Sequence, residues 1–206
     1  MRLVLASQSP ARLATLRAAG LDPEVVVSGV DETQLGLDDP AALAVGLARL
    51  KAAAVADQVV PGDDVVLVVG CDSVLELDGE IHGKPGSADK AVSRWRRMRG
   101  RSGVLHTGHC VVEVSPSGVH RELAREARTV VHFADLTDAE IAAYVGTGEP
   151  LHVAGAFTLD GLGGAYVTGI EGDPHTVVGI GLPLLRDMVR ELGHEWHALW
   201  RLPDLP

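Results

Sequence analysis

An acidic side chain follows an apolar segment near the middle of the chain. Residues 65–69 are apolar at every position, which predicts a strand that is buried on both faces and ends at Gly70. Asp72 comes just beyond it, and ligands of open α/β sheets bind outside the carboxyl ends of strands. Carboxylates in such positions serve as bases or as ligands of cations. We therefore expect Asp72 to belong to a functional site.

A hairpin follows, because Asp78-Gly79 is a dipeptide that strongly indicates a two-residue turn between strands. Antiparallel pairing around this turn would place Ser73 opposite Lys84, and so bring Lys84 beside Asp72. The same residues also fit a plain hairpin in which Asp72 caps the first strand and Lys84 is solvated. The pattern alone favours neither interpretation.

Residues 2–6 predict a strand, and a polar turn then leads into a helix. Ser9 suits the N-cap of this helix, and Gly20 suits the position after its last turn. The free N–H groups of the helix start, together with Ser7 and Arg12, are suited to binding a phosphate. Taken alone, ordinary capping and a surface arginine explain these residues more simply.

The composition limits the classes of function. With 206 residues, 46% of them apolar, the chain can form one large domain or two small lobes that share a core. The net charge of −10 argues against a broad surface for nucleic acid or anionic membrane. Because no apolar run reaches the roughly 18 residues of a membrane span and no signal peptide is visible, we expect a cytoplasmic protein.

The remaining pattern alternates strands and helices. We expect Asp39 to cap a long helix that reaches Ala56 and carries Lys51, and Ser87 to cap a helix whose arginines mostly face solvent. Cys71 and Cys110 lack the spacing of a metal site, so we expect reduced, buried thiols. The other expected elements are strands at 25–27, 104–114, 119–133 and 165–170, helices at 137–146 and 183–193, and a loosely packed tail.

Four glycines occur between residues 155 and 164, which suggests a backbone shaped to approach another group closely. An ordinary loop would show the same composition.

Several short segments, each weak by itself, match one family in order and spacing. Together they resemble the Maf family of nucleoside triphosphate pyrophosphatases over nearly the whole chain, to about residue 193. The segments are 5–12 (LASQSPAR), 30–32 (VDE), Lys51, 70–73 (GCDS), 83–85 (GKP), 106–108 (HTG), 148–150 (GEP), 154–157 (AGAF), 161–163 (GLG), 178–179 (VG) and 182–184 (LPL).

The resemblance implies one elongated α/β domain, with a central mixed sheet flanked by helices and two lobes around a nucleotide cleft, similar to inosine triphosphate pyrophosphatases. It also implies hydrolysis between the α and β phosphates of a nucleoside triphosphate, which removes unwanted nucleotides, with Mg²⁺ or Mn²⁺ and in a possible homodimer. The family has been linked to septum formation. The alternative function is therefore a nucleotide-dependent regulator of cell division that acts through a protein partner.

The resemblance assigns catalytic roles to four positions. Asp72 would accept a proton from the attacking water, and Glu32 would share a divalent cation with it. Lys51 and Lys84 would bind and stabilise the triphosphate.

It assigns binding roles to six further positions. Arg12 would bind phosphate, and Ser7 and Ser9 would donate hydrogen bonds to it. Ala11, Ser73 and Asp160 would set the base preference. Members that act on dTTP and UTP carry Arg and Gln where this chain has Ala11 and Asp160, so the chain more closely resembles the branch that acts on 7-methyl-GTP.

Overall fold

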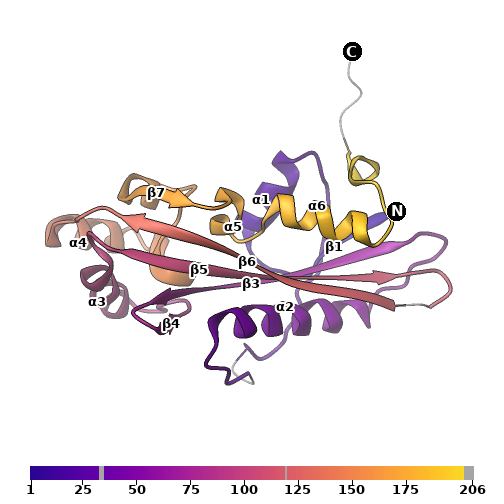
Figure 1. Ribbon diagram of the computed structural model, residues 1–206, viewed down its shortest axis with the longest axis horizontal. Helices are drawn as coiled ribbons and strands as arrows, with labels where there is room; N and C mark the ends of the chain where they lie inside the picture. The colour runs from indigo at the N-terminus through magenta and orange to yellow at the C-terminus, as the bar shows by residue number, and fades with distance from the viewer. Residues whose placement is uncertain (33–34, 119, 202–206) are drawn as a thin grey trace, which may run out of the picture.

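The computed structural model describes residues 1–32, 35–118 and 120–201. In this part of the chain a mixed, seven-stranded sheet forms the centre of an elongated molecule (Figure 1). Its strand order is β2-β1-β3-β5-β6-β7, with β4 paired to β3. The strands are β1 (Arg2–Leu5), β2 (Glu24–Val25), β3 (Val66–Leu77), β4 (Glu80–His82), β5 (Ser102–Val114), β6 (His120–Phe133) and β7 (Val167–Glu171).

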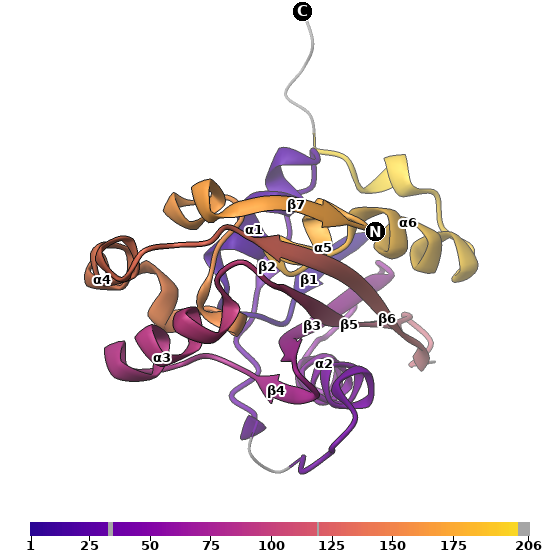
Figure 2. The ribbon, with the colours of Figure 1, turned by 60° about the vertical axis from the view of Figure 1, so that its left-hand side comes forward.

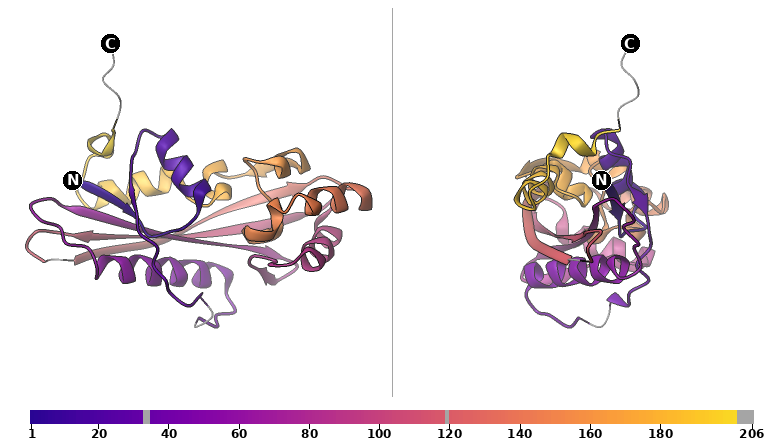
Figure 3. Two further views of the ribbon diagram at one scale, coloured as in Figure 1. Left: turned by 180° about the vertical axis from the view of Figure 1, so that it is seen from behind. Right: turned by 90° about the vertical axis from the view of Figure 1, so that its right-hand side faces the viewer.

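Helices cover both faces of the sheet, which confirms the predicted mixed α/β class. Figures 1 and 2 show α2 on one face and α1, α5 and α6 on the other, and the end-on view in Figure 3 shows the same layers. The α-helices are α1 (Pro10–Ala18), α2 (Pro40–Ala56), α3 (Ala88–Met98), α4 (Asp138–Gly146), α5 (Pro174–Val178) and α6 (Leu182–Glu191). Short 3-10 helices are η2 (Glu149–His152), η3 (Ala154–Ala156), η4 (Leu162–Tyr166) and η5 (Trp196–Leu199).

The predicted helix starts are confirmed. Ser9, Asp39 and Ser87 each accept a hydrogen bond from a backbone N–H of the first helical turn. Thr137 forms a capping box with Glu140. These caps are local interactions, which is why the sequence alone predicted them.

The short helices of the structure were not predicted, and α5 and η5 are two of them. Helix α5 begins at Pro174, where no helix was expected, and Asp173 caps it by accepting from two backbone N–H groups. Helix η5 lies in the tail that we expected to be loosely packed, but Leu199 is buried and Trp200 bridges to Leu21. Residues 202–206, the end of that predicted tail, lie outside the described residues.

Strand β3 is longer than predicted, because it does not end at Gly70 but continues to Leu77. The reason is β5, which pairs with β3 from Val66 through Glu76 and keeps the backbone extended. The strand that ends here is β1, whose last residue pair is Leu5 with Val69. The Asp72 position is therefore beyond the end of β1 and not beyond the end of its own strand.

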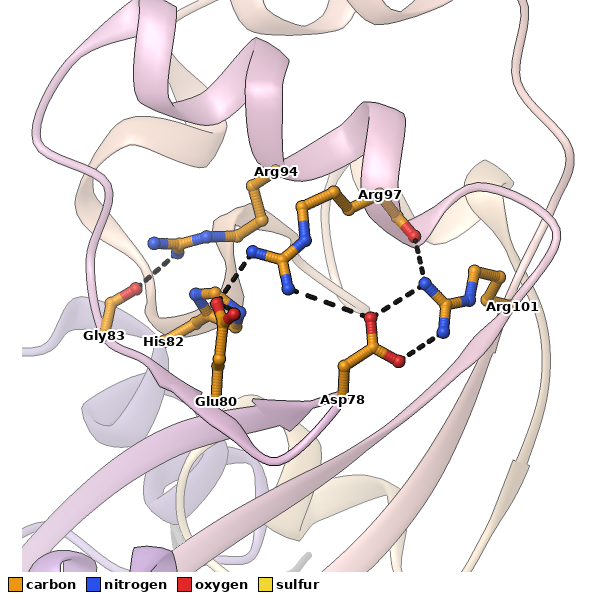
Figure 4. Close-up of polar contacts among 7 residues, drawn as sticks. All are labelled: Asp78, Glu80, His82, Gly83, Arg94, Arg97 and Arg101. Carbon is orange, nitrogen blue, oxygen red and sulfur yellow. Dashed lines mark hydrogen bonds and ion pairs between the residues drawn. The ribbon is translucent and has the colours of Figure 1, made fainter. Parts of the chain in front are cut away.

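The hairpin between β3 and β4 is confirmed only at its turn. Leu77 pairs with Glu80 and Leu75 pairs with His82, as predicted. The predicted pairing of Ser73 with Lys84 is wrong, because β4 ends at His82. The chain then turns toward α3 (Figure 4).

Both cysteines are free and buried, as predicted. Burial raises the pKa of Cys71 to about 11 and that of Cys110 to about 12, so both are thiols at neutral pH. No helix in the described part of the chain is long and apolar enough to cross a membrane.

Helix α2 packs directly on the backbone of the two central strands. A β-carbon at Gly70 would lie 2.3 Å from the carbonyl oxygen of Ala48, and one at Gly108 would lie 2.2 Å from that of Ala44. Only glycine allows this close approach. The helix in turn carries Lys51 toward Asp72.

We predict that Gly108→Ala destabilises the protein by about 1–3 kcal/mol or more, because the methyl group meets rigid helix backbone. For a chain of this size that corresponds to a fall in Tm of roughly 2–12 °C, which thermal unfolding will measure. Gly146→Ala is the control, because a β-carbon there meets nothing within 4 Å. Equal Tm values for the two variants would show that α2 does not need this contact.

Candidate active site

Lys51, Asp72 and Glu32 form one ionic cluster on the α2 face of the sheet. Lys51 projects from α2, and its ammonium donates a hydrogen bond to Asp72 on β3. The same ammonium lies 2.7 Å from a carboxylate oxygen of Glu32. Both Lys51 and Asp72 are buried, whereas the Glu32 side chain is 43% exposed. The cluster thus extends from the sheet to the solvent.

The electrostatics of Glu32 link this cluster to two further cations. Burial alone would raise the pKa of Glu32, but the hydrogen bond from Lys51 and the charges of Lys51, Lys84 and Arg12 hold it below its usual value. Lys84 is exposed in the loop after β4. All three predicted phosphate-binding cations therefore act on one carboxylate.

Arg12 is buried on the opposite face of the sheet. Its Nε donates to the carbonyl oxygen of Gly179 at 2.8 Å, and its two terminal nitrogens donate to the hydroxyls of Ser7 and Ser73 at 3.2 and 3.3 Å. These bonds fix the plane of the guanidinium. They use three of its five N–H groups.

The hydroxyl groups around Arg12 form a connected network. Ser73 bonds to Thr107 at 2.9 Å, and Thr107 donates to the carbonyl oxygen of Thr176 at 3.0 Å. On the other side, Ser7 accepts from the backbone N–H of Ser9 at 3.1 Å. The structure therefore brings together the predicted residues Ser7, Ser9 and Ser73.

A residue that the sequence analysis missed, His109, fixes the loop behind Arg12. It is fully buried, its Nδ1 donates to the carbonyl oxygen of Thr107 at 3.1 Å, and its Nε2 accepts from the N–H of Gly181 at 2.7 Å. Burial above all lowers the pKa of His109 to about 4, so the ring is neutral and can accept this bond. The sequence offered one signal for this role. His109 lies two residues after Thr107, so on one strand both side chains point to the same face of the sheet.

The two faces meet at a gap in the sheet. Because β5 occupies one side of β3, both β1 and β4 pair with its other side, β1 as far as Val69 and β4 only from Leu75. In the described part of the chain, no strand pairs with that edge between these residues. Asp72 and Ser73 lie in the gap and point to opposite faces, as neighbours on a strand do. A ligand at this edge can therefore contact groups from both faces.

Glu32 and Asp72 fit the predicted divalent cation. Their carboxylates both contact the Lys51 ammonium, so the two acidic groups lie close enough to share one cation. Among the described residues there is no group of three or more side chains suited to hold a metal. In proteins, Mg²⁺ can be held by one or two carboxylates, with water and phosphate as its other ligands.

Of the three predicted base-specificity positions, Asp160 stands apart from Ser73. It lines a groove of about 300 Å³ between α1 and α5. Neither Ser73 nor Ala11 lines this groove, although the Ala11 carbonyl accepts from the side chain of Thr15, which does. The other lining residues are Ala18, Ala19, His175, Val178 and Leu182.

Glu149 organises the glycine-rich segment that carries Asp160. Its carboxylate accepts from the N–H groups of Leu162 and Gly163 at 3.0 and 2.9 Å, and from the hydroxyls of Tyr144 and Thr158. Burial alone would raise the pKa of Glu149, but these donors hold it below its usual value. The sequence analysis did not predict this role.

The glycines of this segment approach other protein groups. A β-carbon at Gly163 would lie 2.3 Å from the hydroxyl of Tyr144, and one at Gly161 would lie 2.8 Å from the carboxylate of Glu149. The close approach that we expected from the composition is therefore an approach of this backbone to other groups of the protein, around Glu149.

A family model described as Maf-like protein matches residues 2–192. The chain belongs to the Maf family. Proteins with similar sequences come from Salinispora tropica, 58% identical over 97% of this chain and 88% of that protein, and from Cutibacterium acnes, 56% identical over 97% and 95%. Both relatives are named nucleoside triphosphate pyrophosphatase.

Among solved structures, a nucleoside-triphosphatase described as a dITP/XTP pyrophosphatase from Mycobacterium abscessus aligns with a TM-score of 0.37 and 15% identity. The alignment covers 94% of this chain and 97% of that one.

Proposed function

We propose that this Maf-family protein is a nucleoside triphosphate pyrophosphatase that cleaves the α–β phosphate bond and releases the monophosphate and pyrophosphate. The observation that carries this proposal is the gap in the sheet, where Asp72 and Glu32 meet Lys51 on one face and Arg12 lies on the other. Acidic groups and cations at one edge suit a reaction between water and a triphosphate. The names of the similar proteins support the same activity.

In this proposal, Asp72 orients the attacking water and accepts its proton. The bond from Lys51 fixes the carboxylate, because a buried ion pair has few alternative positions. A divalent cation, held when bound by Glu32 and Asp72, supplies positive charge to the phosphates.

Arg12 and Lys84 neutralise phosphate oxygens. The hydrogen bonds of Arg12 to Ser7, Ser73 and Gly179 leave two N–H groups of its guanidinium for substrate, and the fixed plane orients them before binding. The exposed Lys84 is a mobile point charge that can follow the leaving pyrophosphate.

We predict that the purified protein releases pyrophosphate from a panel of nucleoside triphosphates that includes GTP, 7-methyl-GTP, dTTP and UTP. Excess EDTA should abolish the reaction, and Mg²⁺ or Mn²⁺ should restore it. With substrate labelled at the γ phosphate, all label should appear as pyrophosphate. Labelled orthophosphate would show cleavage of the wrong bond. No product from any nucleotide would favour the alternative, a division regulator acting through a protein partner.

A further inference from the structure

The arginines of α3 and of the residues that follow it keep much of their side-chain surface exposed, as the sequence analysis expected, but three of them also reach the β3–β4 hairpin. Figure 4 shows three of them side by side above the hairpin. Arg97 lies 2.7 Å from Glu80, and Arg101 pairs with Asp78. Arg94 instead donates to the carbonyl oxygen of Gly83, at 2.6 Å. The remaining two, Arg96 and Arg99, pair with Asp138.

Arg94 differs from the other four because it has no carboxylate within 4 Å among the described residues. It is also partly buried. Burial, and next the charge of Arg97, lower its pKa from the usual value. Holding a cation in such surroundings without a counter-charge is unfavourable. Fold stability is therefore a poor explanation for an arginine at this position, and its one bond to Gly83 becomes the informative contact.

That bond fixes the backbone just before Lys84. The Gly83 carbonyl also accepts from the N–H of Gly155 at 3.3 Å, and the N–H of Gly86 donates to Leu151 at 3.1 Å. Between these anchors, the Lys84 side chain remains exposed. Since β4 ends at His82, no sheet pairing holds this loop. Arg94 connects it to α3 through the hydrogen bond to Gly83.

We propose that Arg94 is a positioning residue that holds the loop of Lys84 so that this lysine faces the phosphates bound at the sheet gap. The inference rests on the proposed function, because it assumes that Lys84 binds substrate phosphate. His82 pairs with Leu75 at the edge of the gap, so the loop that carries Lys84 leaves the sheet beside it. The Arg94 guanidinium itself acts on the backbone carbonyl and not on the substrate.

The first test is Arg94→Met, which keeps much of the volume and removes the donor. We expect kcat/KM for the best nucleotide of the panel to fall about tenfold, mainly through a higher KM, because a misplaced lysine weakens phosphate binding. The control is Arg96→Met on the same helix, whose guanidinium pairs with Asp138 on the surface. It should stay within about twofold of the wild type. Thermal unfolding of both variants will show whether they fold equally well.

The second test is a double-mutant cycle with Lys84→Ala. If Arg94 acts only through Lys84, adding Arg94→Met to Lys84→Ala should change kcat/KM by less than about twofold. Binding of inorganic pyrophosphate with Mg²⁺, measured by calorimetry, should follow the same pattern.

Two outcomes would overturn the positioning role. One is an additive tenfold loss in the double variant, which would mean that Arg94 contacts phosphate or acts by charge alone. The other is wild-type kinetics for Arg94→Met in an active enzyme. A wild type that releases no pyrophosphate from any nucleotide would instead overturn the proposed function, and this inference with it.

Discussion

Asp72→Asn should lower kcat by roughly a hundredfold or more while the protein stays folded. Asparagine has nearly the same shape, and its side-chain oxygen can still accept the hydrogen bond from Lys51. The amide cannot take a proton from water, so the proposed base is lost. Lys51 would keep Glu32 as its counter-charge, at 2.7 Å, which protects the fold from an unpaired buried cation. Steady-state release of pyrophosphate will measure the loss.

The control for this variant is Glu76→Gln. Glu76 lies on the same strand and face as Asp72, but it contacts His106 at 3.1 Å and lies beyond the gap, where β4 pairs with β3. Its activity should stay within about threefold of the wild type, since no proposed role falls on it. Near-normal turnover in Asp72→Asn would remove Asp72 from the role of base.

Features of the structure that depend on neighbouring residues were predicted correctly from the sequence. Ser9, Asp39, Ser87 and Thr137 cap their helices as expected, because an N-cap needs only a side chain and a backbone N–H three residues away. The turn at Asp78-Gly79 is likewise local. The mixed α/β class was implied by the family resemblance, and the order of the predicted elements was compatible with it.

The predictions that were wrong concern features that depend on segments distant in the sequence. We predicted that a strand ends at Gly70, because glycine interrupts the apolar run. Pairing with β5 instead continues β3 to Leu77. Gly70 allows the backbone of α2 to pack closely against the strand at this position. We predicted that the hairpin pairs Ser73 with Lys84, but its last residue pair is Leu75 with His82. The next residue, Gly83, instead accepts a hydrogen bond from Arg94.

The candidate site shows the same division. The family resemblance suggested four site residues, and the structure places all of them at one gap in the sheet: Asp72, Glu32, Lys51 and Arg12. The face of the sheet on which each residue lies could be known only from the fold. His109 was missed because its partner Gly181 lies 72 residues away. A histidine in a buried strand is an equally good sign of packing, so only the fold assigns it a role.

The base preference should change with Asp160→Gln. A carboxylate accepts two hydrogen bonds from the N1–H and exocyclic amine of guanine, whereas uracil and thymine present carbonyl oxygens on both sides of one N–H. An unmatched polar contact costs roughly 1–3 kcal/mol, which is about tenfold to a hundredfold in discrimination. We therefore expect kcat/KM for GTP or 7-methyl-GTP to exceed that for dTTP and UTP in the wild type. The variant should shift this ratio toward pyrimidines about tenfold or more.

The groove around Asp160 makes this test specific. No lysine or arginine is among its lining residues in the described part of the chain, and Asp160 is the only acidic side chain there. Its backbone is fixed by the bonds of Glu149 to the next residues of the segment, which should leave the Asp160→Gln side chain in the same place. Asp187→Asn on α6, which contacts Arg186 at the surface, should leave the ratio unchanged. A wild type that prefers dTTP and UTP tenfold or more, or an unchanged ratio in Asp160→Gln, would show that Asp160 caps its own turn and does not contact the base.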